Sequence, residues 1–218
     1  MRIAVLGTGD VGRTLASAFI TLGHEVRMGS RSASSPKALA WASSAGERAS
    51  VGTFSDAAAW GEWVVVATLG TALPMMLRAA GAESFGDKLV IDTTVPIDLS
   101  SGRPALALGF TESCGEQLQA FLPRAKVVKA FTTVGHSLMF RPALEGGPPD
   151  MFVCGDDAEA KRRVGELLAE MGWGMVDVGG ILTSRYLEPM ALVWMLVGVQ
   201  RGGFAHAFKL IGRGEAAR

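Results

Sequence analysis

Short apolar runs alternate along the chain with segments in which apolar residues recur every three or four positions. Residues 3–6 form the first apolar run. Residues 11–22 then carry apolar side chains at positions 11, 15, 18, 19 and 22, a spacing typical of an amphipathic helix. The same alternation predicts strands at residues 25–28, 50–53, 63–68, 88–92, 126–130, 151–154 and 175–178, and helices at residues 34–45, 74–80, 114–121, 158–171 and 184–199.

Strands separated by helical segments are typical of a parallel sheet with helices on both faces. We therefore predict an α/β fold, a Rossmann-type doubly wound parallel sheet with a small C-terminal helical part. Residues 1–150 are expected to form a dinucleotide-binding Rossmann domain. Residues 151–218 are expected to form a C-terminal extension that completes the sheet and supplies an apolar helix, with the boundary near residues 146–150.

Composition narrows the choice of partners and compartment. The 218 residues include 21 Lys and Arg and 21 Asp and Glu, so the formal net charge is zero, and neither nucleic acid nor a membrane is an expected partner. The longest uncharged run, residues 63–77, is too short to span a bilayer. The N-terminal stretch lacks the features of a signal peptide, so we expect a cytoplasmic protein. Cys114 and Cys154 are isolated and are expected to be buried thiols.

A glycine motif of the form G-x-G-x-x-G lies between the first predicted strand and the first predicted helix. Its residues are Gly7, Thr8, Gly9, Asp10, Val11 and Gly12. In this context Gly7 permits a tight turn, Gly9 lets the backbone approach a pyrophosphate, and Gly12 lets the helix pack closely on the strand. The free N–H groups of the helix start would face the anion. The side chain of Asp10 could cap the helix, so we expect Asp10 to turn its backbone rather than its carboxylate to the ligand.

The end of the second predicted strand favours NADP over NAD. An NAD site usually has an acidic residue here to accept from the ribose 2′-hydroxyl, but this chain has Ser30 and Arg31, with Lys37 a turn further on. A hydroxyl and a guanidinium suit a 2′-phosphate, and Thr8 can add a second hydroxyl. The alternative for Arg31 is a solvated loop charge.

The loops after the later strands are expected to hold the nicotinamide. Residues 68–70, 93–96 and 131–135 are small, apolar or hydroxylic, and Thr68, Leu69 and Thr132 are candidates to flank the ring. Because these loops contain no evident acid or base, we expect no catalytic side chain and direct hydride transfer between NADP(H) and a small-molecule redox acceptor. Two alternatives stay open: a dehydrogenase or imine reductase with His136 or Lys129 as proton donor, and a non-catalytic NADP(H)-sensing module.

Six motifs together resemble the family of NADPH-dependent coenzyme F420 reductases, also called F420-dependent NADP oxidoreductases. They are GTGDVG at residues 7–12, GSRS at 29–32, DTTVP at 92–96, ESCGEQLQAFLP at 112–123, KVVKAFTTVG at 126–135 and MFVCGDDAEAKRRV at 151–164. The resemblance implies a Rossmann domain with a small C-terminal part, a homodimer, and hydride transfer between NADP(H) and the deazaflavin coenzyme F420.

The resemblance also assigns individual residues. Thr8, Ser30 and Arg31 match the family's 2′-phosphate contacts, and Leu69 and Pro96 match positions near the nicotinamide. The chain departs from the family at Thr132, where the family commonly has Asn, and in its tail, residues 202–218. Both departures bear on the second substrate, and similar sequences include ferric-reductase-like proteins.

The predicted helix at residues 184–199 is apolar nearly all round. Such a helix has to be covered on several faces. It either belongs entirely to the core or crosses a homodimer interface, and the sequence leaves both possibilities open.

Overall fold

A computed structural model describes residues 1–212, and the last six residues of the predicted extension, 213–218, lie outside the described part. Six strands form one parallel sheet in the order β3-β2-β1-β4-β5-β8. They are β1 (Arg2–Leu6), β2 (Glu25–Ser30), β3 (Ala49–Thr53), β4 (Trp63–Val66), β5 (Leu89–Asp92) and β8 (Lys126–Lys129). Strands β4 and β5 are buried along their whole length, as expected for a parallel sheet covered on both faces.

The order of the strands along the chain reverses at β1. Strands β2 and β3 lie on one side of it, and β4, β5 and β8 lie on the other. Val5 in β1 pairs with Met28 of β2 and with Val65 of β4. Ligands of open parallel sheets bind outside the carboxyl ends of the strands at such a reversal, so the topology alone locates the candidate site.

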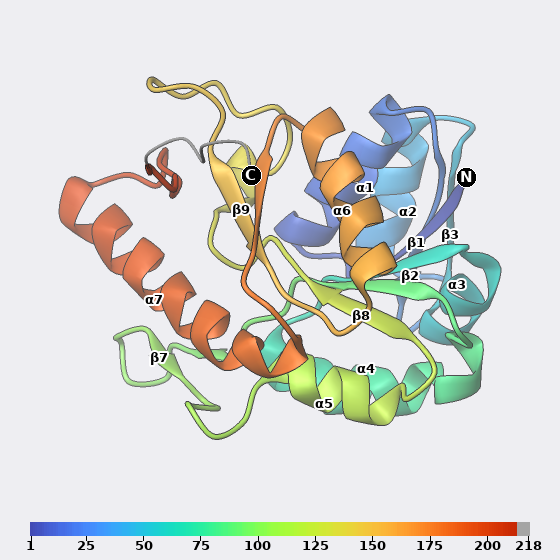
Figure 1. The fold of residues 1–218 in the computed structure, drawn as a ribbon. Coiled ribbons are helices and arrows are strands. Elements are labelled where there is room, and N and C mark those ends of the chain that lie inside the picture. Colours follow the sequence, from blue (N-terminus) through green and yellow to red (C-terminus); the bar gives the residue numbers. More distant parts are fainter. Residues whose placement is uncertain (213–218) are drawn as a thin grey trace.

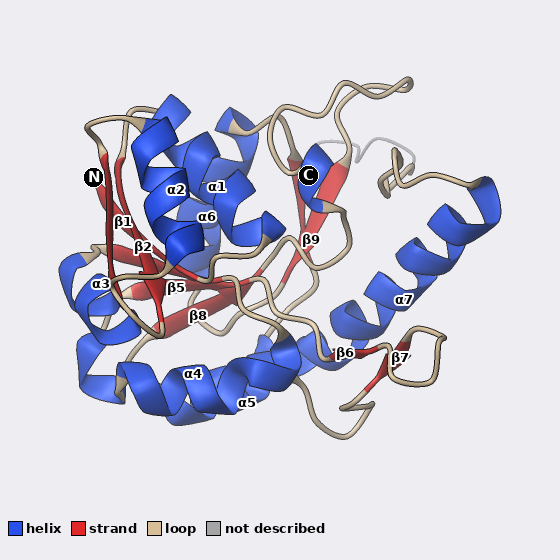
Figure 2. Cartoon of the chain, turned by 180° about the vertical axis from the view of Figure 1, so that it is seen from behind, coloured by secondary structure: helices blue, strands red, loops and turns tan. Residues whose placement is uncertain are grey.

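Helices cover both faces of the sheet (Figures 1 and 2). The helices of residues 1–212 are α1 (Asp10–Thr21), α2 (Pro36–Ala45), α3 (Phe54–Trp60), α4 (Leu73–Ala80), α5 (Cys114–Phe121), α6 (Ala158–Glu170) and α7 (Ser184–Arg201), of which α7 runs beside the sheet rather than over it (Figure 1). Short 3-10 turns join them at η1 (Gly70–Ala72), η2 (Ala82–Ser84), η3 (His136–Leu138) and η4 (Ile181–Thr183). The predicted doubly wound Rossmann-type fold is confirmed.

Two apolar cores lie on opposite faces of the sheet because side chains of a strand alternate between its faces. Val5 joins Phe19 of α1 and the residues of α2 and α6 in one core. Its neighbour Leu6 joins Leu73 of α4 and Leu118 of α5 in the other. Figure 1 shows α1, α2 and α6 on one side of the sheet and α3, α4 and α5 on the other.

The strands beyond residue 149 correct one expectation. Strands β9 (Asp150–Val153) and β10 (Gly174–Asp177) pair with each other in parallel and form a separate two-stranded sheet rather than completing the main one. One antiparallel bridge, Lys129–Cys154, links the two sheets. A parallel neighbour needs a crossover connection, usually a helix, but only the 3-10 turn η3 lies between β8 and β9. The returning chain therefore runs antiparallel to β8 and leaves the sheet.

Two further features lie at the edge of the fold. Strands β6 (Ile97–Asp98) and β7 (Ala105–Leu106) form a small antiparallel pair that the pattern analysis did not predict. Helix α7 starts near α5 and runs outward past this hairpin (Figures 1 and 2). Within residues 1–212, no helix is both long enough and apolar enough to cross a bilayer.

Candidate cofactor site

A cleft of about 860 Å³ opens at the carboxyl ends of β1, β2 and β4. Nine of the thirteen residues predicted to bind cofactor line it: Gly7, Thr8, Gly9, Asp10, Val11, Ser30, Arg31, Thr68 and Leu69. The other four, Gly12, Lys37, Pro96 and Thr132, lie outside its lining. The loops that follow five different strands therefore meet in one cavity, since Thr93 after β5 and His136 after β8 also line it.

The three glycines of the motif have different structural tasks. Gly7 adopts φ +138°, and a Cβ on it would lie 2.2 Å from the carbonyl oxygen of Ala67. A Cβ on Gly12 would lie 2.3 Å from the carbonyl oxygen of Gly7. A Cβ on Gly9, by contrast, would meet no atom within 4 Å. Packing thus demands Gly7 and Gly12, whereas the open side of Gly9, at the N-terminus of α1, suits the close approach of an anion.

The carboxylate of Asp10 forms an ion pair with Arg13 and does not cap helix α1. It accepts a hydrogen bond from the Arg13 guanidinium at 2.5 Å. The residue that caps α1 is Gly9, without a side-chain bond, so the suggested capping role of Asp10 is wrong. Arg13 also donates to the carbonyl oxygen of Thr8 at 3.3 Å. The pair offsets a negative charge that would otherwise repel a pyrophosphate.

The turn after β2 presents Arg31 to the cleft. The Ser30 hydroxyl donates to the carbonyl oxygen of Ser32 at 2.6 Å, so it shapes this turn. Arg31 itself is exposed and lines the cavity, and within residues 1–212 it forms no ion pair. Lys37 is exposed on α2 and outside the lining. A free guanidinium with no acidic residue on the same turn suits a 2′-phosphate rather than a 2′-hydroxyl.

Two threonine hydroxyls lack partners, that of Thr68 in the cleft lining and that of Thr132 outside it. Both Oγ1 atoms are shielded from solvent and form no hydrogen bond with the described residues. Leaving a buried polar group unpaired costs about 1–3 kcal/mol. The carboxamide of a nicotinamide offers both a donor and an acceptor, so the unpaired hydroxyl of Thr68 fits the group that a dinucleotide would place in the cleft. The backbone of Thr132 follows Phe131, which adopts the left-handed φ of +62° although it is not glycine.

The cleft also has apolar walls. Leu69 is 75% exposed and Met75 is 47% exposed, and both line the cleft. Pro96 is buried. It lies next to Gly70, since a Cβ on Gly70 would be 2.6 Å from the Pro96 nitrogen. The pattern analysis missed Met75, together with Phe54 and Met76 of the lining. The sequence offered only their position as a clue, since each lies on a helix that follows a strand ending at this edge of the sheet.

Of the two candidate proton donors, His136 lies in the cleft lining and Lys129 does not. His136 lines the cleft, with Nδ1 3.5 Å from Thr14 Oγ1. Lys129 is fully buried and outside the lining. Burial alone would lower the pKa of Lys129, but the carboxylates of Asp92 and Glu188 outweigh it and raise that pKa. Because Lys129 stays charged and out of contact with the cleft, it is unsuited to donate a proton to a substrate.

Comparison with known proteins agrees with this geometry. Residues 2–96 match the family model described as NADP oxidoreductase coenzyme F420-dependent. The F420-dependent NADP reductase of Methanothermobacter thermautotrophicus is 33% identical over 202 residues, which cover 86% of this chain and 85% of that protein. The chain belongs to the F420-dependent NADP oxidoreductase family. It is therefore an NADP-dependent oxidoreductase, which sets aside the non-catalytic alternative.

Two further proteins are similar to the chain over most of its length. A crystal structure of a candidate F420-dependent NADP reductase from Arthrobacter sp. FB24 has a TM-score of 0.90 and 40% identity, and the match covers 96% of this chain and 99% of that one. The metalloreductase STEAP3 of Rattus norvegicus is 28% identical over 195 residues. That match covers 88% of this chain but only 36% of STEAP3, so the chain spans about a third of that longer protein.

Proposed function

We propose that this enzyme transfers a hydride between NADP(H) and a deazaflavin acceptor of the F420 type. The observation that carries the proposal is the acceptor end of the cleft, where Leu69 and Met75 expose apolar surface and Thr68 and Thr93 add only hydroxyls. Transfer between two redox cofactors needs proximity and orientation more than a side-chain acid or base. The F420-dependent NADP reductase named above supports the same acceptor class.

The dinucleotide, when bound, supplies the hydride. The chain's own residues hold and orient it. The backbone at Gly9 and the first N–H groups of α1 face the pyrophosphate, while Arg31 donates to the 2′-phosphate. The Thr68 hydroxyl, which lines the cleft without a partner, would donate to or accept from the carboxamide. Leu69 shields one edge of the ring from water, which strengthens every polar contact inside the cleft.

An apolar platform suits a flat acceptor. Leu69 and Met75 face the cleft from η1 and α4 with large exposed fractions, and a planar ring stacked on the nicotinamide would cover both. Covering them removes apolar surface from water, a gain of about 25 cal/mol per Å². The same contact would exclude water from the path of the hydride.

The direct test is an anaerobic assay with NADPH and purified F420. We expect reduction of F420 at a rate at least about tenfold above that with FMN or ferric citrate, a difference of about 1.4 kcal/mol in barrier. Turnover with ferric citrate or a cyclic imine, without turnover with F420, would overturn the proposal. NADH serves as the cofactor control in each reaction.

His136 favours a second candidate, a dehydrogenase or imine reductase of a small organic substrate. Imidazole is a common general acid in enzymes, and this one lines the cleft. Replacement His136→Gln keeps a polar side chain but removes the imidazole. A loss of activity toward an imine or alcohol of about a hundredfold or more would support general acid catalysis. An unchanged rate with F420 would separate the two candidates.

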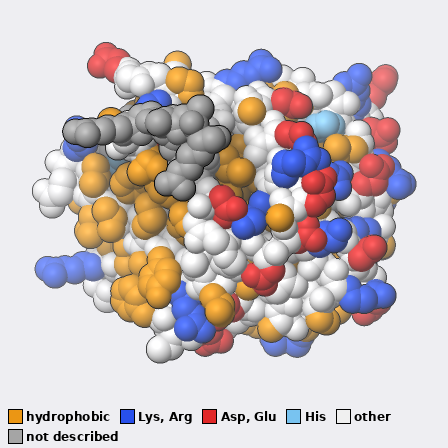
Figure 3. Space-filling view, in the orientation of Figure 1, with side chains coloured by type: hydrophobic (Ala, Val, Ile, Leu, Met, Phe, Trp, Pro, Cys, Tyr) orange, Lys and Arg blue, Asp and Glu red, His pale blue; other side chains and the backbone are white. Residues whose placement is uncertain are grey.

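We also propose that the enzyme is a homodimer assembled through α7. Tyr186, Pro189, Val193 and Leu196 follow one another at spacings of three, four and three residues, the periodicity of a helix-packing seam. Tyr186, Val193 and Leu196 are more than half exposed, and Figure 3 shows apolar side chains gathered over this helix. Glu188, the one charged residue between positions 186 and 200, is buried, so an uncharged face is left for a second copy of the chain.

We propose that the enzyme works in the cytoplasm. The support is the pair of thiols, since Cys114 and Cys154 are both free and buried. Free thiols are the usual state in a reducing compartment.

A further inference from the structure

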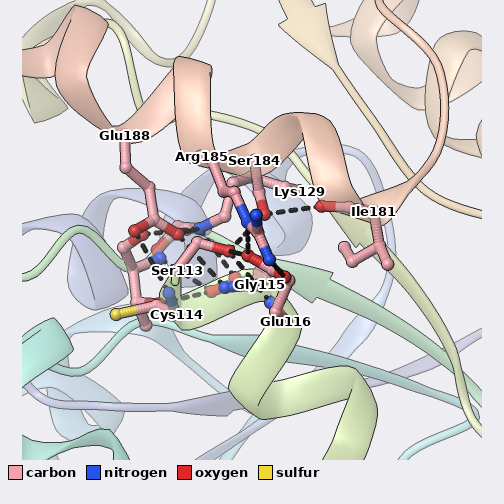
Figure 4. Close-up of polar contacts among 12 residues, drawn as sticks. Ser113, Cys114, Gly115, Glu116, Lys129, Ile181, Ser184, Arg185 and Glu188 are labelled. Atoms are coloured by element: carbon pink, nitrogen blue, oxygen red, sulfur yellow. Dashed lines mark hydrogen bonds and ion pairs between the residues drawn. The ribbon is translucent and has the colours of Figure 1, made fainter. Parts of the chain in front are cut away.

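Lys129, the last residue of β8, carries a buried ammonium next to the start of α5 and to Glu188 of α7 (Figure 4). Lys129 Nζ is 2.7 Å from Asp92 Oδ2 and 2.9 Å from Glu188 Oε1. It also donates to the carbonyl oxygen of Thr94 at 2.7 Å. Lys129 and Asp92 are completely buried and Glu188 is 2% exposed. The ammonium thus forms one hydrogen bond, to the Thr94 carbonyl oxygen, and two ion pairs with buried carboxylates.

Glu188 ties three elements together at this point. It projects from α7, and its carboxylate accepts the backbone N–H groups of Cys114 and Gly115 in the first turn of α5, each at 3.1 Å. Its third contact is Lys129 at the end of β8. A side chain at position 115 would block this approach, because a Cβ on Gly115 would lie 2.9 Å from Lys129 Cε. Burial raises the pKa of Glu188, and the Lys129 ammonium and the N–H groups at the start of α5 partly oppose this effect.

Asp92 and Lys129 fix the loop 93–95 from two sides. Asp92 Oδ1 accepts from the backbone N–H of Thr94 at 2.8 Å and from its hydroxyl at 2.7 Å. Lys129 holds the Thr94 carbonyl oxygen. The neighbouring Thr93 turns toward the cleft and lines it. The Thr93 hydroxyl is held separately, since it donates to the carbonyl oxygen of Val66 at 3.0 Å, so the buried charges act on the backbone of this loop at Thr94.

The same loop supports the wall that carries Leu69. A Cβ on Gly70 would lie 2.5 Å from the carbonyl carbon of Val95, so η1 rests directly on the loop. A small shift of residues 93–95 would move this turn, and with it Leu69. Removing one partner leaves uncompensated buried charge, whereas a well-packed apolar set of the same volume is often equally stable. Stability alone therefore does not account for three buried charges at this place.

We propose that Lys129 and Glu188 are positioning residues for hydride transfer: they hold loop 93–95, and through it the wall against which the nicotinamide lies, in register with α7. This inference rests on the proposed NADP(H) site but not on the identity of the acceptor. We call the contacts of Lys129 with Asp92, Glu188 and Thr94 the tie. The inference predicts that breaking the tie weakens binding of the nicotinamide end of the dinucleotide but not of the adenosine end. The adenosine 2′-phosphate would lie at Arg31 and the pyrophosphate at Gly9, and Lys129 and Glu188 form no hydrogen bond or ion pair with either residue.

The test compares Glu188→Gln with Glu116→Gln. Both remove one carboxylate charge between α5 and α7, since Glu116 pairs with Arg185 at 2.6 Å, but Glu116 has no contact with Lys129 or with loop 93–95. Affinity for 2′,5′-ADP, which lacks the nicotinamide, is measured beside that for NADP+. For Glu188→Gln we expect NADP+ to bind about tenfold more weakly with 2′,5′-ADP unchanged, and the single-turnover hydride rate to fall about 10- to 100-fold. For Glu116→Gln we expect neither change.

Two outcomes would overturn the inference. One is a Glu188→Gln enzyme whose NADP+ affinity and hydride rate match the parent. The other is an equal loss of affinity for NADP+ and 2′,5′-ADP, which indicates general loosening of the fold. If Glu188→Gln does not fold, Thr94→Val tests the same loop, because it removes the hydroxyl bond to Asp92 and leaves all three charges paired. The affinities for NADP+ and 2′,5′-ADP do not depend on the acceptor. They therefore test the positioning role even if F420 is not reduced.

Discussion

The backbone at Gly12 lies so close to Gly7 that a Cβ on Gly12 would be 2.3 Å from the Gly7 carbonyl oxygen. The neighbouring Gly9 has no such restriction. The two positions therefore separate folding from binding within one motif. Gly12 serves the packing of α1 on the sheet, and Gly9 serves the ligand.

Replacing each glycine by alanine tests this division. Gly12→Ala should lower the free energy of unfolding by about 1–3 kcal/mol, because backbone atoms must shift. Gly9→Ala should leave stability unchanged within about 0.5 kcal/mol and weaken NADPH binding, because the methyl group occupies the side that faces the pyrophosphate. Urea unfolding and NADPH fluorescence titration measure the two effects. Equal stability of the two variants would contradict the assignment.

Arg31→Asp should reverse the preference for the phosphorylated cofactor. A charge-assisted hydrogen bond to a phosphate contributes about 1.5–3 kcal/mol, so NADPH should bind about 10- to 100-fold more weakly while NADH is little affected. Lys37→Asp makes the same change of charge at an exposed position outside the cleft lining. We expect a much smaller effect there. Equal losses for NADPH and NADH in the Arg31 variant would refute the 2′-phosphate contact.

Replacing Thr132, whose hydroxyl is unpaired, should raise the free energy of unfolding but weaken the binding of NADP+. Thr132→Val keeps the shape and removes a buried oxygen without a partner, so the unliganded enzyme should gain about 1 kcal/mol in its free energy of unfolding. Affinity for NADP+ should fall, while that for 2′,5′-ADP stays constant. A destabilised variant would show that the hydroxyl is satisfied in the free enzyme.

Leu196→Glu should convert a dimer to a monomer. It places a charge in the middle of the exposed seam of α7, where desolvation in an interface is unfavourable. Leu39→Glu is the control, since Leu39 is also an exposed helical leucine, at 47%, but lies on α2. Light scattering after gel filtration distinguishes the masses. A parent protein that is already monomeric, or a dimer in both variants, would contradict the proposed interface.

The thiols should resist modification in the folded enzyme. Burial raises the pKa of Cys114 to about 12 and that of Cys154 to about 11. Because a raised thiol pKa keeps the neutral form, reactive thiolate should be scarce throughout pH 7–9. Iodoacetamide should label neither residue at pH 8 before unfolding and both afterwards, as mass spectrometry would show. Rapid labelling of the folded enzyme would indicate that the α5 or β9 region opens.

Local motifs made the phosphate-binding half predictable. Gly7, Gly9 and Gly12 stand within six consecutive positions, and their spacing alone encodes the turn. Helix α3 was missed because it has seven residues, too few for a periodic pattern. The capping box between Thr53 and Asp56 was the one local signal for its start.

The tie at Lys129 was not predictable in the same way. Asp92, Lys129 and Glu188 are far apart in the chain, and their contact depends on β5, β8 and α7 meeting in space. A charged residue in a sequence is read as solvent-facing by default. The available signal was Glu188 itself, a lone charge in an otherwise uncharged stretch from 186 to 200.

One backbone bridge, between Lys129 and Cys154, links β9 to the six-stranded sheet, but apolar packing joins the two parts much more widely. Val164 and Leu168 of α6 lie in the same buried cluster as Val5 and Phe19. Everything that contacts the dinucleotide's phosphates in the proposed complex precedes this bridge in the chain, while β9, β10 and α7 follow it. An engineer seeking a new hydride acceptor therefore has to keep the apolar face of α6 and a carboxylate at the place of Glu188.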